Sequence, residues 1–427
     1  MKIRLYNARI LEPISMTVSN GEVWVTDGMI TYVGDGKANV DEAKVLQWDE
    51  QVDCENNLLM PGFKNAHTHS GMTFLRSIAD DLPLHEWLNQ RIFPSEAKLS
   101  MEYIYSFTKL AVLEYLTSGV TAIFDMYLCP EMVAKACQEM GMRLTMVSGL
   151  NDFTSSIKQT AEEYEKFNQS GSLISYHLGC HAEYTTHKNT LLELKELAHH
   201  YKAPVYTHLC ETEYEVKACL ERHGKTPIEF LDSIDMFEYG GGGYHCIYLS
   251  DKEMDIMKEK NLSAVTCPGS NTKLASGIAP VKQLLDKGIN VAIGTDGPAS
   301  NNCLDMFREM FLVAGLAKLK DMDAVAIDGD RVLQMATLGG SKAIGLSNCD
   351  TIKAGQTADL ILIDLKQPNM QPIHNLSKNL VYSGSKTNIK MTMIAGKILY
   401  RNGHFNGFDA NQIYDEVNQI VQKLGLN

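Results

Sequence analysis

The sequence contains no apolar run that approaches the roughly 20 residues needed by a membrane-spanning helix. Its first residues, Met1 to Tyr6, lead directly into a strand pattern and lack the apolar stretch of a signal peptide. These two absences argue against an integral membrane protein and against a secreted one. We therefore expect a cytoplasmic protein with no membrane partner.

Positive charge is also scarce. The 39 lysines and arginines are outnumbered by 52 aspartates and glutamates, so the formal net charge is -13. Binding to a nucleic-acid polymer needs a basic surface that releases phosphate counterions, so no such partner is expected. Small neutral or cationic substrates fit this charge better.

The ten cysteines include no C-x-x-C pair and do not form the pattern of a disulfide framework. A catalytic thiol is disfavoured, because nothing in the sequence marks one as activated. Several cysteines lie in or beside apolar strand patterns, where a reduced cysteine acts as a small hydrophobe: Cys180, Cys210, Cys246 and Cys267.

Both ends of the chain have the strand patterns of an antiparallel sheet. Near the N-terminus two apolar runs flank Asp27-Gly28, a dipeptide suited to a two-residue hairpin, and a similar pair flanks Ala395-Gly396. Two β-rich pieces at opposite ends of a chain can pair into one small domain. We predict a discontinuous β-sandwich domain from residues 1–58 and 350–410, and a C-terminal helix over 411–427.

Residues 59–349 repeat a different pattern, in which a short buried strand is followed by a loop and a helix. Eight such units close a TIM-type (β/α)8 barrel, which takes roughly 250 residues. A doubly wound open sheet is the alternative, but no glycine-rich phosphate loop follows any of these strands. The expected strands are Leu58–Asn65, Thr121–Met126, Arg143–Leu150, Ser172–His181, Ala203–Leu209, Gly243–Leu249, Ser263–Cys267 and Asn290–Gly294.

Side chains that can bind a metal follow several of the expected strands. His67 and His69 come after the first strand, and their spacing places both imidazoles on one face of an extended chain. His208 lies at the end of the fifth strand, His245 in the sixth, and Asp296 after the eighth. In a barrel these strand ends meet at a single mouth.

Each histidine alone has an ordinary structural explanation, because a lone H-x-H or strand histidine is usually satisfied by a local hydrogen bond. Their joint placement at one mouth instead predicts a site for a divalent metal. Glu211 lies three residues past His208, near enough to face the ion without binding it.

The stretch from Met60 to His69, Met-Pro-Gly-Phe-Lys-Asn-Ala-His-Thr-His, resembles the opening motif of the amidohydrolase superfamily. Three further stretches narrow the match: 207–212, 270–280 and 294–302. Together they resemble the branch that contains the S-adenosylhomocysteine and methylthioadenosine deaminases, guanine deaminase and the chlorohydrolase-like triazine hydrolases. The resemblance covers essentially the whole chain.

This resemblance implies one divalent ion per chain, zinc with iron as the alternative, bound by His67, His69, His208 and Asp296. No residue matches the carboxylated lysine that bridges two metals in hydantoinase-type relatives, which supports a single ion.

The resemblance also implies catalytic roles. His245 matches a residue that orients the attacking water, and Glu211 matches the proton shuttle. A divalent cation lowers the pKa of a bound water from 15.7 toward about 7, and Asp296 can take the water's proton. The expected reaction is attack on an amidine-like ring carbon, with replacement of an amino group by oxygen and release of ammonia.

Three positions are implied to bind substrate. Glu96 matches a carboxylate that binds ribose hydroxyls in adenosine-type deaminases, although a solvated first-turn glutamate is the alternative. His181 matches a histidine that contacts the substrate ring. Ser148 stands where adenosylhomocysteine deaminases place an arginine for the amino-acid carboxylate, and residues 151–158 contain no arginine. We therefore expect an uncharged nucleoside such as 5′-deoxyadenosine, methylthioadenosine or adenosine.

Two local features depart from what is usual. Cys180 and Glu183, which flank His181, stand where prolines are common in the family. The run Gly240 to Gly243 has no explanation from sequence beyond close backbone packing.

Three functions stay open at this point. The favoured one is an aminohydrolase that acts on a small heterocyclic substrate of the adenine type and assembles as a homo-oligomer. The second is a hydrolase of another ring (guanine, a pterin, a pyrimidine) or a triazine-type enzyme with another leaving group; Glu211 disfavours chloride, which leaves without a proton. A non-catalytic scaffold is the third, and it gives no reason to keep buried ionisable groups.

Overall fold

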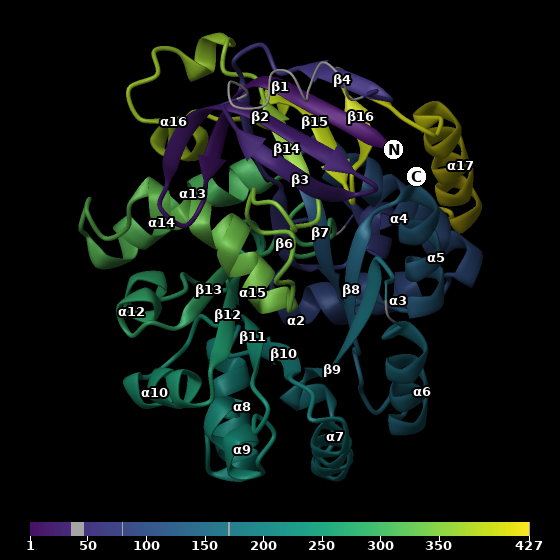
Figure 1. Ribbon diagram of the computed structural model, residues 1–427. Helices are drawn as coiled ribbons and strands as arrows, with labels where there is room; N and C mark the ends of the chain where they lie inside the picture. Colours follow the sequence, from purple (N-terminus) through teal and green to yellow (C-terminus); the bar gives the residue numbers. More distant parts are fainter. Residues whose placement is uncertain (36–46, 79, 170, 427) are drawn as a thin grey trace.

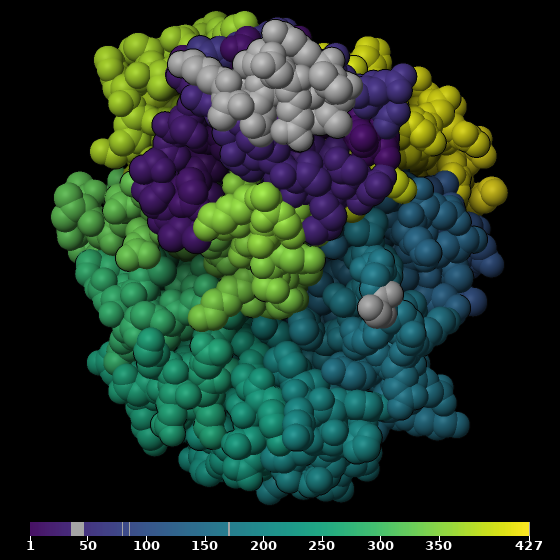
Figure 2. Space-filling view, in the orientation of Figure 1, coloured from purple at the N-terminus to yellow at the C-terminus, as the bar shows by residue number. Residues whose placement is uncertain are grey.

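The computed structural model describes residues 1–35, 47–78, 80–169 and 171–426. Figure 1 shows two parts: a sheet from both ends of the chain lies at the top, and a barrel with surrounding helices lies below it. The two termini lie near each other beside the upper sheet. In the space-filling view the N-terminal strands, the bright-green segment near residue 350 and the barrel form one continuous surface (Figure 2).

The barrel has eight strands, and each is parallel to its neighbours in the order β13-β12-β11-β10-β9-β8-β7-β6. The predicted TIM-type barrel is therefore confirmed. Its strands are β6 (Phe63–Thr68), β7 (Val120–Asp125), β8 (Arg143–Val147), β9 (Ile174–Ala182), β10 (Val205–Leu209), β11 (Gly241–His245), β12 (Leu262–Thr266) and β13 (Asn290–Ile293).

The side chain of Asn65 joins the first barrel strand to the segment after the last. Its Nδ2 donates to Thr295 Oγ1 at 2.7 Å, and its Oδ1 accepts from the Thr295 backbone N–H at 2.9 Å. A Cβ on Gly294 would lie 2.8 Å from Cβ of His67, so only glycine permits this close approach. The contact brings the loops after β6 and β13, which carry predicted metal ligands, next to each other.

The strand predicted over Leu58–Asn65 is wrong in one respect. This stretch contains two strands, β5 (Leu58–Pro61) in the other sheet and β6 in the barrel, and they are separated at Gly62. The apolar residues run on from Leu58 across Gly62 to Phe63, and both strands are buried along their whole length, so the sequence does not reveal the change of sheet.

The second sheet draws its nine strands from both ends of the chain, in the order β17-β16-β15-β14-β5-β1-β2-β3 with β4 also paired to β1. It is one branched and mainly antiparallel sheet that surrounds its own apolar core. The other strands are β1 (Lys2–Glu12), β2 (Thr17–Thr26), β3 (Met29–Gly34), β4 (Glu50–Asp53), β14 (Leu360–Ile363), β15 (Ile389–Ile394), β16 (Lys397–Arg401) and β17 (His404–Phe405).

Both predicted hairpin turns form. Asp27 and Gly28 have φ of 48° and 86°, and Ala395 and Gly396 have φ of 47° and 73°, as a two-residue turn between twisted strands requires.

Helices cover the outside of the barrel, and shorter ones lie in its loops (Figure 1). The α-helices are α2 (Leu84–Trp87), α3 (Phe93–Glu96), α4 (Met101–Thr117), α5 (Pro130–Met140), α6 (Ile157–Phe167), α7 (Lys188–Tyr201), α8 (Glu213–His223), α9 (Pro227–Ser233), α10 (Asp251–Glu259), α11 (Pro268–Lys273), α12 (Val281–Asp286), α13 (Met306–Asp321), α14 (Gly329–Gln334), α15 (Gly340–Ile344), α16 (Leu376–Tyr382) and α17 (Ala410–Leu424). The other turns of helix are η1 (Ser70–Leu75), η2 (Leu88–Ile92), η3 (Glu183–Thr185), η4 (Met335–Gly339), η5 (Pro368–Met370) and η6 (Lys386–Asn388). Throughout the described ranges, no helix is both long enough and apolar enough to cross a membrane.

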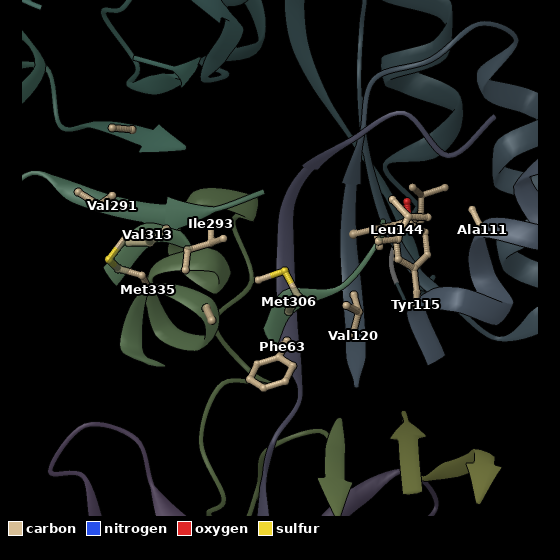
Figure 3. Packing of buried hydrophobic residues seen from close by; sticks show 14 of the residues in the cluster. Phe63, Ala111, Tyr115, Val120, Leu144, Val291, Ile293, Met306, Val313 and Met335 are labelled. Atoms are coloured by element: carbon tan, nitrogen blue, oxygen red, sulfur yellow. The ribbon is translucent and has the colours of Figure 1, made fainter. Parts of the chain in front are cut away.

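The main apolar core fills the layer between the barrel strands and the outer helices (Figure 3). Phe63 of β6 packs edge-on against Phe307 of α13, with ring centroids 5.2 Å apart. Figure 3 shows two groups of buried side chains in this layer, one around β13 with Val291, Ile293, Val313 and Met335, and one around β7 and α4 with Ala111, Tyr115, Val120 and Leu144.

The glycine run before His245 allows β11 to approach its neighbours closely. A Cβ on Gly241 would lie 1.9 Å from the Val205 carbonyl oxygen, and one on Gly242 would lie 2.4 Å from that of Ser263. Any side chain at these positions would push β10 and β12 away from β11.

A buried ion pair ties the barrel to the second sheet. Arg143, the first residue of β8, donates from Nε to Asp359 Oδ2 at 2.6 Å and from Nη2 to Oδ1 at 2.9 Å. Asp359 also accepts the backbone N–H of Ala395 at 2.8 Å. The second sheet thus packs on the amino-terminal end of β8, which leaves the carboxyl ends of the barrel strands free for a site.

Candidate active site

The carboxyl ends of the barrel strands bring the predicted metal-binding residues together. Nε2 of His69 lies 3.1 Å from Asp296 Oδ1, and Nε2 of His67 lies 3.6 Å from the same oxygen. The ring of His208 lies 4.9 Å from that of His67, and the ring of His245 lies 5.6 Å from that of His208. All five side chains are buried, so they form one cluster at the barrel mouth.

Two overlapping groups in this cluster have ligand geometry. The ligand atoms of His67, His69 and Asp296 lie within 4.8 Å of one another, and those of His67, His208 and His245 do as well. His67 belongs to both groups and is the centre of the cluster. The ligand set His67, His69, His208 and Asp296 stays a prediction, because His245 falls within the same 4.8 Å limit as His208.

Hydrogen bonds orient three of the histidines in the same way. Nδ1 of His208 lies 2.6 Å from the carbonyl oxygen of His181, Nδ1 of His69 bonds the carbonyl oxygen of Met126, and Nδ1 of His245 lies 2.8 Å from Asn271 Oδ1. Each of these acceptors takes the proton on Nδ1 and leaves Nε2 directed into the cluster. Such outer hydrogen bonds fix the tautomer and ring orientation of metal-binding histidines.

His67 provides a test of whether a metal fits here. Both of its ring nitrogens are buried, and neither has a hydrogen-bond partner within the part of the chain that the structure describes. Its ring stacks on Tyr244, with centroids 3.7 Å apart and planes at 19°. A buried imidazole with no partner is costly, and a ligated ion at one nitrogen would remove that cost. The donor set of imidazoles and one carboxylate suits zinc.

The carboxylate of Asp296 is held by three hydrogen-bond donors and faces His69. Oδ2 accepts the hydroxyls of Ser270 at 2.6 Å and Ser300 at 2.8 Å. Oδ1 accepts the backbone N–H of Gly297 at 2.8 Å and faces His69. Ser270 and Ser300 lie inside the quoted sequence motifs, but no role was predicted for them, because a serine after a strand carries no signal of its partner.

Left-handed backbone conformations direct these side chains inward. His245 and Asp296 have φ of 69° and 60°, and Cys210, which precedes Glu211, has φ of 53°. A non-glycine residue in this region costs about 1 kcal/mol, and such strain persists where the surrounding structure fixes it.

The electrostatics of the cluster favour neutral His67 and His208. Burial, reinforced by the neighbouring histidines, lowers the pKa of both well below the ordinary value. Burial also opposes a charge on His69, but the hydrogen bond and charge of Asp296 outweigh it and raise the pKa of His69 to about 9. Neutral imidazole is the form that binds metal, and burial keeps His67 and His208 in that form.

Glu211 lies beside the cluster and is buried. Its Oε2 is 3.8 Å from Nε2 of His245, and its Oε1 is 3.5 Å from the hydroxyl of Ser276. Burial raises the pKa of Glu211, and His245 opposes this effect only in part. The carboxylate of Glu215 holds the loop by accepting the backbone N–H groups of Cys210 at 2.9 Å and Glu211 at 2.8 Å. The residue predicted as proton shuttle is thus placed next to the cluster in a proton-retaining environment.

The structure also places two of the three predicted substrate-binding residues at the site. The ring of His181 lies 4.8 Å from that of His208. Glu96, at the end of α3, is half-buried beside Tyr127, and burial raises its pKa to about 7, moderated by Tyr127 and by the charge of His69. Neither the surroundings nor the pKa of Glu96 matches a solvated surface glutamate.

Ser148 differs from the other two. It is buried, and its hydroxyl bonds both backbone groups of Gly179, donating to the carbonyl oxygen and accepting from the N–H at 2.8 Å. Its proton is therefore used within the protein. No geometry at Ser148 supports a substrate contact, and that role remains only a prediction.

The chain is similar to known proteins along most of its length. The sequence model of the amidohydrolase family matches residues 58–399. A 5-methylthioadenosine/S-adenosylhomocysteine deaminase of Syntrophomonas wolfei is 37% identical, and the alignment covers 99% of each chain. A 5′-deoxyadenosine deaminase of Methanopyrus kandleri is 35% identical, again over 99% of each chain.

Solved structures agree as well. An adenosine deaminase from Xanthomonas campestris with bound zinc superimposes with a TM-score of 0.93 at 32% identity, covering 100% of this chain and 98% of the other. A guanine deaminase from C. acetobutylicum shares the fold, with a TM-score of 0.82 at 21% identity, covering 93% of this chain and 100% of the other. These matches confirm the resemblance carried by the sequence motifs. The chain belongs to the amidohydrolase family and is a hydrolase of carbon–nitrogen bonds.

Proposed function

We propose that the protein is a metal-dependent aminohydrolase that replaces the exocyclic amino group of an adenine nucleoside with oxygen and releases ammonia. The observation that carries the proposal is the buried pair of Glu211 and His245 beside the cluster of histidines and Asp296. An amino group is a poor leaving group until its nitrogen is protonated, when it departs as ammonia, and Glu211 is a buried acid placed where that proton is needed.

The proposed cofactor is one zinc ion per chain, with iron as the alternative, bound by His67, His69, His208 and Asp296. When bound, a divalent cation lowers the pKa of a water from 15.7 toward about 7 and polarises it for attack. The neutral imidazoles and the anchored Nδ1 atoms described above support this ligand set. A cytoplasmic location and assembly as a homo-oligomer remain predictions from the sequence.

Side chains of the protein itself are proposed to carry out proton transfer and positioning. Asp296 accepts the proton of the attacking water, and the hydroxyls of Ser270 and Ser300 hold its carboxylate in place. His245, held by Asn271 through Nδ1, is left with Nε2 to orient the attacking water. Glu211 gives its proton to the ring nitrogen as the oxygen–carbon bond forms, then takes the remaining proton of the added hydroxyl and delivers it to the departing amine as the carbon–nitrogen bond breaks. The water proton held by Asp296 finally restores the acid form of Glu211.

The proposed substrate is an uncharged adenine nucleoside, of the 5′-deoxyadenosine, methylthioadenosine or adenosine type. The names of the relatives at 35% and 37% identity support this class. Glu96 supports it independently, because a partly buried carboxylate close to the cluster can accept two ribose hydroxyls.

The test is ammonia release from a panel of nucleosides, free purines, pterins, pyrimidines and triazines, with zinc-loaded and iron-loaded protein. We expect adenine nucleosides to have the highest kcat/KM. A triazine or guanine that reacts faster than every adenine nucleoside would replace the proposed substrate. No release from any compound would favour a scaffold.

A further inference from the structure

The turn that follows His181 is anchored by an unusual buried cluster around Glu183. Glu183 is the first residue of η3 and is 3% exposed. Its carboxylate accepts both Nε and Nη2 of Arg222, with Nε at 3.3 Å, and it lies 2.9 Å from Nε2 of His223. Glu183 stands where the family commonly has a proline. In place of the rigid proline ring, the structure has a carboxylate held by Arg222 and His223.

This turn holds the ring of His181 and the backbone that follows it. The hydroxyl of Thr185 lies 3.1 Å from Nδ1 of His181 and accepts the backbone N–H of Ala182 at 3.2 Å. The carbonyl oxygen of His181 accepts the Nδ1 proton of His208 at 2.6 Å. A shift of this turn therefore moves the His181 ring and changes the hydrogen bond that orients His208.

Both partners of Glu183 lie in the last turn of α8, and α8 packs against η3. His223 is itself held by stacking on Phe230, with ring centroids 3.8 Å apart and planes at 4°. The first turn of the same helix contains Glu215, which fixes the backbone of Glu211. One helix thus connects the loop that carries Glu211 to the turn that follows His181.

We infer that Arg222 and His223, acting through Glu183, are positioning residues that hold His181 at the substrate and set the orientation of His208. The part that concerns substrate rests on the proposed function, whereas the orientation of the two rings does not. The carboxylate of Glu183 keeps its contact with His223 without Arg222, whose side chain is 40% exposed. Removal of Arg222 should therefore leave the fold intact and free the turn.

The first experiment compares Arg222→Gln with Lys217→Gln in the zinc-loaded enzyme. Lys217 lies on the same helix and pairs with Glu213, and both of these side chains are about two-thirds exposed, at 66% and 64%. For the best nucleoside we expect Arg222→Gln to raise KM about tenfold with kcat changed less than about threefold, since displaced contacts weaken binding before chemistry. Lys217→Gln should change neither constant.

A double-mutant cycle separates positioning from a general structural role. In a His181→Ala background, Arg222→Gln should raise KM no further, because the group it positions is already missing. An unchanged KM in the single variant, or effects of the two substitutions that multiply, would overturn the inference.

A second measurement does not depend on activity. In protein labelled with 15N-histidine, we expect Arg222→Gln to shift the ring-nitrogen signals of His181 and His208, and Lys217→Gln to leave them in place. Ring signals unmoved by Arg222→Gln would refute the inference even if nucleosides are deaminated. Shifted signals with no nucleoside deaminated would support the positioning role and refute the proposed function.

A rescue variant tests the route through Glu183. Ala182 has extended backbone angles, φ −160° and ψ 163°, which suit a residue before proline, and proline is favoured at the first position of a helical turn. We expect Glu183→Pro to fix the turn without an ion pair, so that Arg222→Gln no longer raises KM in that background. A tenfold rise that persists there would show that Arg222 does not act through Glu183.

Discussion

Oε2 of Glu211 lies 3.8 Å from Nε2 of His245, and both side chains are buried beside the same cluster of metal-binding groups. Because burial raises the pKa of Glu211, the acid keeps a proton closer to neutral pH than an exposed glutamate does. The pair therefore combines a proton donor with an imidazole that faces the reaction.

Replacing Glu211 by glutamine should separate chemistry from metal binding. We expect Glu211→Gln to retain the metal, because Glu211 is not among the proposed ligands, and to lose kcat by about 100-fold or more. The measurements are elemental analysis and steady-state deamination. Glu213→Gln is the matched control, since this neighbouring glutamate is exposed and should have no effect. Near-normal kcat in Glu211→Gln would exclude the shuttle role.

Removal of a proposed ligand should act on the metal first. We expect protein purified without chelator to contain about one divalent ion per chain, and His67→Ala to lose the ion and the activity together. His187→Ala is the control, because that histidine's side chain is 82% exposed and lies outside the cluster. Two ions per chain in the parent protein would contradict a mononuclear site.

The pKa of Glu96 predicts a pH dependence of substrate binding. With its pKa raised to about 7, Glu96 is ionised above that pH and protonated below it. Only the ionised carboxylate accepts both ribose hydroxyls, so KM for a nucleoside should rise as the pH falls through about 7. In Glu96→Gln the KM should be higher at pH 8 and should lose this dependence. A KM profile that is identical in the two proteins would show that Glu96 does not bind the ribose.

The 5′ substituent should decide among adenine nucleosides. The arginine-free loop after Ser148 offers no bidentate partner for an amino-acid carboxylate, so methylthioadenosine and 5′-deoxyadenosine should exceed adenosylhomocysteine in kcat/KM. Ser148→Arg alone should not reverse the order, because that side chain is buried and bonded to Gly179. Adenosylhomocysteine as the best substrate would require another cation at the site.

The ion pair between Arg143 and Asp359 should contribute to stability, not to catalysis. Asp359→Ala leaves a buried guanidinium and an unpaired Ala395 N–H, and we expect a loss of about 3–5 kcal/mol in the free energy of unfolding, measured by urea titration. Lys166→Ala, which removes an exposed ion pair with Glu131, should cost less than about 1 kcal/mol. Equal losses in the two variants would contradict the role of Arg143–Asp359 in joining the two sheets.

Much of the architecture could be predicted because the signals are local. Strand patterns separated by helices predict the barrel, and Asp27-Gly28 predicts a hairpin turn that forms. The break at Gly62 could not be predicted, since it depends on Thr121 and Asp359, which lie far away in the sequence.

In the site, too, local features are predictable from sequence and long-range contacts are not. His67 and His69 are predictable from their spacing at the end of one strand. The acceptors that orient the histidines are not, because the carbonyl oxygens of Met126 and His181 carry no side-chain signature and are identified only by the fold. Asn271 could be predicted only in part. It lies in a recognised motif, but its contact with His245 appears only in the structure.

The most direct test of the central claim is the reaction of zinc-loaded enzyme with 5′-deoxyadenosine in 18O-labelled water. The account predicts one ammonia per nucleoside consumed, and a product in which one 18O atom replaces the exocyclic amino group while the ribose stays attached. Glu211→Gln should give the same product far more slowly. Cleavage of the glycosidic bond, product without 18O, or no reaction with any adenine nucleoside would contradict it.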